Sequence, residues 1–138
     1  REKMREKECL VVKDPNELNN YTCFDVKLPS YLPEGYEFAE AEFYKDENGD
    51  VENTKYISLH FTNEKAGKRI YMQQRFAEEE TGYATGANKV EEIKINGVDA
   101  VLYDDNNLDW EYNGVIYMLS GRGEIAKDEL IKIAESIK

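Results

Sequence analysis

The stretch Leu108-Asp109-Trp110-Glu111-Tyr112-Asn113-Gly114-Val115-Ile116-Tyr117-Met118-Leu119 decides the fold of this chain. Its Asn-Gly dipeptide lies between short runs of alternating apolar residues. Such a loop is the strongest short-range signal of a β-hairpin, because both central positions of a type I′ turn need positive φ. The turn also sets the register, so the facing pairs can be counted outward: Tyr112 with Val115, Trp110 with Tyr117, and Leu108 with Leu119. One face is then apolar throughout, which a register shifted by one residue would not give.

A second Asn-Gly dipeptide, Asn96-Gly97, predicts another hairpin directly before the first. Counting outward gives these facing pairs: Ile95 with Val98, Lys94 with Asp99, and Ile93 with Ala100. The apolar pairs share one face and the charged pair lies on the other, as the alternation of side chains along a strand requires. The second half of the chain is therefore predicted to be a run of antiparallel strands.

Further strands are predicted upstream, where apolar and polar residues alternate with a period of two. A bulge is expected near Glu40, because the parity of the apolar residues changes there. Residues 16–20 are expected to form one helical turn after the Asp14-Pro15 turn. The predicted strands begin at 11–12 and cover 21–28, 36–44, 55–62 and 70–76.

The end of the chain changes to a helical period. Apolar residues recur there at the spacing of one helix face, at Leu130, Ile131, Ile133, Ala134 and Ile137. Asp128 and Glu129 precede them, where a helix N-terminus favours negative charge, whereas Ala126 near the N-cap position is a poor cap. A single amphipathic helix cannot bury its apolar stripe alone, so we expect it to lie across the apolar face of the sheet.

The predicted fold class is therefore α+β. We expect a single, mostly antiparallel, twisted sheet of about six to eight strands, arranged as a meander of hairpins, with a C-terminal amphipathic helix packed on one face. Residues 1–8 alternate charges without an apolar face, and we interpret them as a charged tether or disordered lead-in. Residues 9–138 are predicted to form one domain, since the chain is too short for two comfortable ones.

The composition excludes some partners. A net charge of −11 argues against binding to nucleic acid, which needs a basic surface to neutralise phosphates. The same charge argues against docking on an anionic membrane surface through a basic patch. No apolar run approaches the roughly 18 residues of a membrane span.

No motif predicts catalysis, a cofactor or a metal. The only histidine, His60, lies in the middle of a predicted strand without a nucleophile elbow elsewhere in the chain. The spacing Asp46-x-Asn48-x-Asp50 imitates the start of a calcium loop, but Val51 and Ile57 replace the required glycine and glutamate, so a turn is predicted instead. Some pair among 29 acidic residues will always lie at glycosidase separation, and no spacing singles one out.

Two cysteines, Cys9 and Cys23, flank the Asp14-Pro15 turn. In an oxidising compartment a disulfide between them would constrain the unfolded chain by about 3 kcal/mol. In a reducing one, Cys23 would be an ordinary small apolar residue within a strand. Both alternatives stay open from the sequence.

Two groups of aromatic residues have different expected roles. Trp110, opposite Tyr117, is interpreted as a core residue beneath the C-terminal helix. On the opposite face, side chains that mix aromatic rings with hydrogen-bonding groups are predicted to form a candidate binding patch, which favours recognition over chemistry. The alternative is an ordinary hydrated sheet face. The patch consists of Tyr56, His60, Tyr71, Gln73 and Arg75.

Three segments together resemble a known family: 28–36 (LPSYLPEGY), 108–117 (LDWEYNGVIY) and 129–137 (ELIKIAESI). They are similar to a domain of unknown function found at the C-terminus of membrane-anchored anti-sigma factors and lipoproteins of Gram-positive, spore-forming bacteria. The likeness covers 28–137. It implies an extracytoplasmic, cell-surface domain tethered by a segment absent from this chain. It implies no catalytic residues, and Ala126 stands where the family often has a serine cap.

We therefore expect a non-enzymatic extracytoplasmic sensor or binding domain of an anti-sigma factor or related surface protein, with a protein or small molecule as its partner. An alternative is a carrier of a lipid or other apolar ligand, held between a curved sheet and the helix near Trp110, Tyr117 and Ile133. A second alternative is a hydrolase that uses carboxylates. The oligomeric state does not follow from the sequence.

Overall fold

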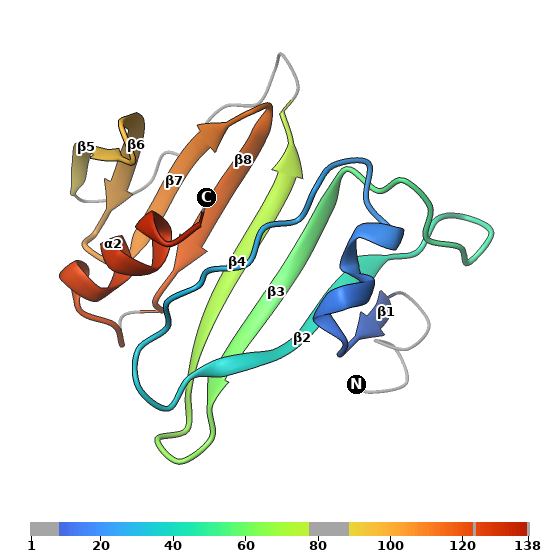
Figure 1. Ribbon diagram of the computed structural model, residues 1–138, viewed down its shortest axis with the longest axis horizontal. Helices are drawn as coiled ribbons and strands as arrows, with labels where there is room; N and C mark the ends of the chain where they lie inside the picture. The colour runs from blue at the N-terminus through green and yellow to red at the C-terminus, as the bar shows by residue number, and fades with distance from the viewer. Residues whose placement is uncertain (1–8, 78–88, 123, 138) are drawn as a thin grey trace.

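Eight antiparallel strands form one sheet in the order β1-β2-β3-β4-β8-β7-β6-β5 (Figure 1). The computed structural model describes residues 9–77, 89–122 and 124–137, so the predicted lead-in at 1–8 lies outside the described residues. A 3-10 helix, η1 (Pro15–Asn20), and a C-terminal helix, α2 (Lys127–Glu135), complete the described elements. The strands are β1 (Cys9–Val12), β2 (Glu37–Tyr44), β3 (Tyr56–Asn63), β4 (Lys68–Phe76), β5 (Val90–Ile95), β6 (Val98–Tyr103), β7 (Asn107–Tyr112) and β8 (Val115–Ser120).

Both Asn-Gly hairpins have the predicted register. In β7–β8, Trp110 pairs with Tyr117 and Leu108 with Leu119, and every predicted pair of β5–β6 is also present. The turn residues have the positive φ that the type I′ geometry needs, 51° and 83° at Asn96-Gly97 and 51° and 76° at Asn113-Gly114. Local turn chemistry therefore determines the pairing in this half of the sheet.

The predicted bulge in β2 is confirmed, because the register against β3 shifts between Phe38 and Glu40. The predicted strand at 21–28 is wrong. Only Thr22 forms an isolated parallel bridge, to Thr54, and residues 24–29 belong to no strand. This segment instead crosses the apolar face of the sheet as irregular chain, so its alternating residues do not pair along an edge.

One face of the sheet carries the core. The segment 24–36 (the crossing segment), η1 and α2 all lie on this side of the strands (Figure 1). The helix buries Leu130, Ile133 and Ala134, and it begins after Ala126, whose side chain makes no capping bond. In the sheet, the fully buried core side chains include Phe43, Ile57, Leu59, Phe61, Ile70, Met72, Leu102, Leu108, Tyr117 and Leu119.

A buried glutamine holds the crossing segment onto the sheet. Gln74 of β4 is fully buried on the apolar face. Its Oε1 accepts a hydrogen bond from the Lys27 backbone N–H at 3.1 Å, and its Nε2 donates to the Lys27 carbonyl at 2.6 Å. The side-chain amide thus pairs with Lys27 as a neighbouring strand would, which satisfies polar groups that are costly to bury alone.

The crossing segment is also joined to the C-terminal helix. Tyr31 Oη donates to Glu129 Oε2 at 2.5 Å, and Ser30 Oγ donates to the Ser136 carbonyl at 3.1 Å. The Lys132 Nζ lies 5.6 Å from the centroid of the Tyr31 ring. Sheet, crossing segment and helix therefore form one packed unit.

We predict that Gln74→Ala lowers the free energy of unfolding by about 2–3 kcal/mol, because it leaves both Lys27 backbone groups without their partner and removes a buried side chain. Chemical denaturation measures the change. The matched control is Gln73→Ala on the opposite, half-exposed face, which should cost no more than about 0.5 kcal/mol. Equal effects of the two substitutions would show that the Gln74 pair contributes nothing specific.

Candidate functional site

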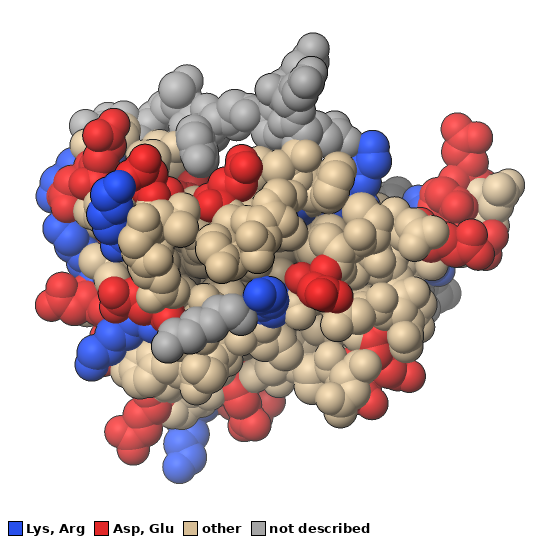
Figure 2. Space-filling view, turned by 45° about the horizontal axis from the view of Figure 1, so that its top comes forward, with Lys and Arg blue, Asp and Glu red and all other residues tan. Residues whose placement is uncertain are grey.

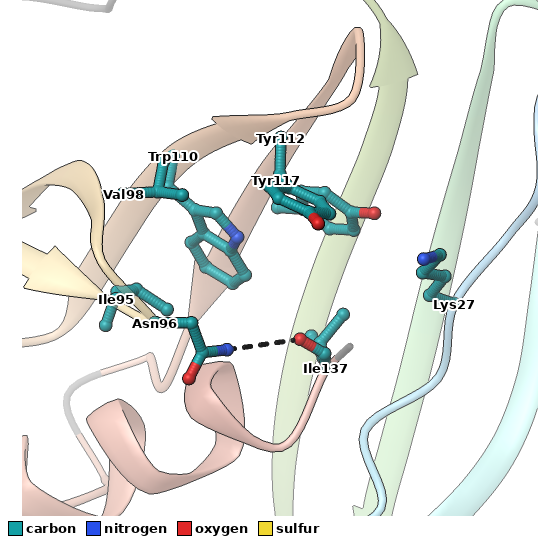
Figure 3. Close-up of a pocket in the computed structure, with 8 residues that line it drawn as sticks. All are labelled: Lys27, Ile95, Asn96, Val98, Trp110, Tyr112, Tyr117 and Ile137. Carbon is teal, nitrogen blue, oxygen red and sulfur yellow. Dashed lines mark hydrogen bonds between the residues drawn. The ribbon is translucent and has the colours of Figure 1, made fainter.

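A pocket of about 400 Å³ opens between the crossing segment, the β7–β8 hairpin and the end of α2 (Figure 3). Volumes of this order are typical of small-molecule sites. The β5–β6 hairpin also contributes, so four separate parts of the chain supply its walls, and the pocket exists only when the domain is folded. The described residues that line it are Lys27, Ile95, Asn96, Val98, Trp110, Tyr112, Tyr117 and Ile137.

Two stacked aromatic rings contribute to the lining. The Trp110 and Tyr117 rings are nearly parallel, with centroids 5.1 Å apart and an interplanar angle of 9°. Both are buried, as predicted for core residues, yet both also border the pocket. The next row of the sheet toward the hairpin turn is more open, since Tyr112 is 45% exposed and Phe76 is 44% exposed. Phe76 and Tyr112 both pair with Val115, so they belong to neighbouring positions on this face.

Lys27 is the only charged side chain among the described residues that line the pocket. Its Nζ lies 5.9 Å from the centroid of the Tyr112 ring, within cation–π distance. The paired hydrogen bonds between Gln74 and the Lys27 backbone determine where this side chain starts. The backbone of Lys27 is thus held by a buried side chain, although it belongs to an irregular segment.

Asn96 closes the opposite wall. Its Nδ2 donates to the Glu135 carbonyl at 3.1 Å and to the Ile137 carbonyl at 3.4 Å (Figure 3 draws the second bond). Carbonyls at a helix C-terminus lack partners within the helix, so this side chain satisfies groups that the helix leaves open. The same asparagine that forms the β5–β6 turn therefore joins that hairpin to the end of α2.

Uncharged side chains cover most of the middle of the surface seen in Figure 2, and charged ones gather mainly toward its edges. The pocket lining has the same character, with one cation and no described carboxylate in a chain of net charge −11. The described lining of the pocket therefore differs in charge from the chain as a whole.

The sequence-predicted binding patch is assembled on the other face of the sheet. Tyr56 pairs with Arg75 and His60 with Tyr71, and Gln73 is opposite Ser58, so the five residues are neighbours on β3 and β4. The His60 and Tyr71 rings have centroids 5.3 Å apart, and the Arg75 guanidinium carbon lies 5.9 Å from the Tyr56 ring centroid. All five side chains are half-buried.

Two further residues of this patch come from β2. Glu42 Oε1 lies 2.9 Å from His60 Nε2, and the Tyr44 ring centroid is 5.7 Å from that of Tyr56. Tyr44 is 55% exposed, more than any of the predicted members. Once the bulge turns Ala41 and Phe43 inward, the residues between and after them must point outward. That parity was the signal that could have found both.

The sequence profile of a domain of unknown function, DUF4367, matches residues 26–137. The chain belongs to this family. The match covers the whole segment over which the resemblance was expected, 28–137, and begins two residues earlier. No match was found among curated proteins or among solved structures.

The DUF4367 domain begins at the crossing segment, so all eight described residues that line the pocket fall inside it. The binding patch also lies within it. Both cysteines lie before its start. No disulfide joins Cys9, which is half-buried in β1, to Cys23, which is exposed and outside the strands. The expectation that Cys23 lies within a strand is therefore wrong, because 21–28 does not form one.

The remaining sequence motifs show no assembled chemistry. Asp46 Oδ1 accepts hydrogen bonds from the backbone N–H groups of Asn48 and Asp50, both at 2.9 Å, so the segment is the predicted turn. In 9–77, 89–122 and 124–137, no group of three or more potential ligands could hold a metal ion. Over the same residues, no helix is long and apolar enough to cross a membrane.

One buried acid was not singled out from the sequence. Asp109 of β7 is 6% exposed and alternates with Leu108 and Trp110, so it points away from the pocket. Burial raises the pKa of Asp109 from 3.8 to about 6. The alternation of the hairpin correctly places Asp109 on the face opposite the pocket, but it predicts a hydrated residue there, and Asp109 is buried.

We predict that Asp109→Asn stabilises the domain near neutral pH. The pKa of this carboxyl is higher in the folded than in the unfolded chain, so its contribution is most favourable below about pH 4 and is lost as pH rises through about 6. The substitution should therefore add about 2 kcal/mol to the free energy of unfolding near pH 7.5 and little near pH 4. Denaturant titrations at the two pH values measure it.

The control is Asp25→Asn, at an exposed position on the same chain. It should leave both unfolding curves within about 0.5 kcal/mol of the unsubstituted protein. A gain for Asp109→Asn that is the same at both pH values would contradict the titration argument.

Proposed function

We propose that this DUF4367 domain is a binding domain that performs no chemistry of its own, and that the pocket beside α2 is its ligand site. The observation that carries the proposal is a pocket of about 400 Å³ with two stacked aromatic rings in its lining. Binding sites for small molecules are concave, mostly apolar and equipped with a few polar groups that orient the ligand. Lys27 and Asn96 are such groups here.

The sequence-based alternative of an apolar carrier expected a ligand near Trp110, Tyr117 and Ile133. Trp110 and Tyr117 do line the pocket, whereas Ile133 is fully buried and absent from its lining, where Ile137 stands instead. The space lies beyond the C-terminal end of α2, and the helix itself packs directly on the sheet. We therefore favour a small ligand at one end of the domain over a long lipid along the helix.

We further propose that the parent protein presents this domain outside the cell, as the sensor part of a membrane-anchored anti-sigma factor or related surface protein of a Gram-positive bacterium. The support is the resemblance of 28–36, 108–117 and 129–137 to domains found in that setting. In such a protein, ligand binding would stabilise the folded domain by mass action. The free energy of unfolding of the domain would then increase with the fraction of domains that hold a ligand.

A second candidate function is docking of a protein partner on the polar-aromatic patch of β2, β3 and β4. The observation that favours it is the cluster of tyrosines with Arg75 on one sheet face, since aromatic residues and arginine are enriched at binding interfaces. A hollow of about 310 Å³ borders the patch at Tyr44 and Tyr56, but the other described residues that line it are all polar or charged. The side chains of the patch also contact one another already, so the mostly apolar pocket beside α2 is the stronger candidate. The hydrolase alternative finds no support in the pocket, whose described lining includes no carboxylate.

We predict that the neutral aromatic probe 1-aminoanthracene binds the domain and quenches the fluorescence of Trp110, the only tryptophan of the chain. Val98→Phe should weaken binding at least about tenfold, because the larger ring fills the pocket. The matched control is Val101→Phe on the opposite face of the same strand, which should leave the affinity unchanged.

Absence of quenching in the unsubstituted protein, or equal affinity of the two phenylalanine variants, would contradict the pocket as the site. The variant Tyr71→Ala tests the second candidate, the polar-aromatic patch. Probe binding that is lost in Tyr71→Ala and kept in Val98→Phe would place the binding surface on the patch.

A further inference from the structure

We infer that the pocket selects small apolar carboxylates, with the carboxylate against Lys27 and the apolar body beside Trp110 and Tyr117. This inference rests on the proposed function and adds the chemical class of the ligand. Three observations support it: the polar atoms of the lining, the lack of a carboxylate partner for Lys27 among the described residues, and the hydrogen bonds that hold the Lys27 backbone.

The polar side-chain groups of the lining can all donate hydrogen bonds. They are the Lys27 ammonium, the Trp110 indole N–H, and the hydroxyl groups of Tyr112 and Tyr117, besides the Asn96 amide whose Nδ2 is occupied by α2 carbonyls. In Figure 3, the Lys27 nitrogen lies on the side of the two tyrosine hydroxyl groups, and the indole nitrogen lies beyond them. A set of donors without a carboxylate suits a ligand that brings acceptors.

Lys27 has no carboxylate partner among the described residues. Its described side-chain contact is the Tyr112 ring, at 5.9 Å from Nζ to the centroid. By contrast, Lys89, Lys94 and Lys127 each form ion pairs with acidic side chains. In a chain of net charge −11, the pocket thus keeps an ammonium group available.

The backbone of Lys27 is held in place before a ligand arrives. Gln74 binds both the N–H and the carbonyl of Lys27, and Gln74 is itself fully buried in β4. Because the backbone is held, only the side-chain torsions of Lys27 lose freedom on binding, and more of its attraction to an anion appears in the affinity. A charge-assisted hydrogen bond from the ammonium to a carboxylate is also stronger than one to a neutral hydroxyl.

The rest of the lining is apolar and of limited size. Ile95, Val98 and Ile137 form aliphatic walls, and the pocket of about 400 Å³ suits a ligand of modest length. Octanoate, 1-octanol and octylammonium have the same apolar body and differ only in the head group. They therefore separate the contribution of the carboxylate from that of the apolar surface.

The test titrates these three compounds into the protein and follows Trp110 fluorescence, with isothermal calorimetry as a second measurement. Octanoate should bind about tenfold more tightly than 1-octanol, and octylammonium should bind most weakly. Lys27→Met should reduce octanoate affinity about tenfold and leave 1-octanol affinity unchanged. Denaturation of each variant verifies that it is folded.

The matched control is Lys132→Met. Lys132 is also a lysine held over a tyrosine, with its Nζ 5.6 Å from the Tyr31 ring centroid, but it does not line the pocket. Its substitution should leave the ratio of octanoate to 1-octanol affinity unchanged.

Equal affinities for octanoate and 1-octanol, or a ratio that Lys27→Met leaves unchanged, would overturn the carboxylate inference while leaving the pocket as a binding site. Failure of all three compounds to bind would also overturn it. The neutral probe and the Val98→Phe variant decide separately whether the pocket binds any ligand, so the two failures are distinguishable.

Discussion

The structure depends on the pairing of one buried side chain with one backbone position. Gln74 reaches from the middle of β4 to the N–H and carbonyl of Lys27, and so holds the crossing segment against the apolar face. A strand in this place would satisfy its backbone N–H and carbonyl groups by hydrogen bonds to a neighbouring strand. An irregular segment has no neighbouring strand, so its buried backbone groups need side-chain partners such as Gln74. The same contact sets the wall of the pocket, because Lys27 lines it.

The pairing of the strands was largely readable from the sequence. Asn-Gly turns need positive φ at both positions, so the loops at 96–97 and 113–114 define the register of their hairpins without help from distant contacts. The bulge in β2 followed from a change of apolar parity around Glu40. The segment 21–28 was misread because alternation alone does not say whether a strand finds a partner. Its start pairs only with Thr54, and at Lys27 its partner is a side chain on β4, far along the sequence.

The two candidate sites also differ in how far the sequence could predict them. The patch on β3 and β4 could be predicted because its residues share a parity and adjoin in a register that the short β3–β4 turn sets. Trp110 and Tyr117 were also placed correctly on the apolar face. The carrier alternative placed a ligand beside Trp110 and Tyr117, but the other walls of the pocket could not be predicted, because they arise where the crossing segment and the end of α2 leave part of that face uncovered. Gln74 carried a signal, since it is a polar residue in phase with Ile70 and Met72.

Native-state hydrogen exchange of the Lys27 amide tests this account most directly. If Gln74 Oε1 accepts that N–H inside the folded domain, the amide is protected to an extent similar to the amides of β4, since it exchanges only when the crossing segment leaves the sheet. Exchange at the rate of an unprotected chain would contradict the account, because the segment would then lie on the sheet without being held to it.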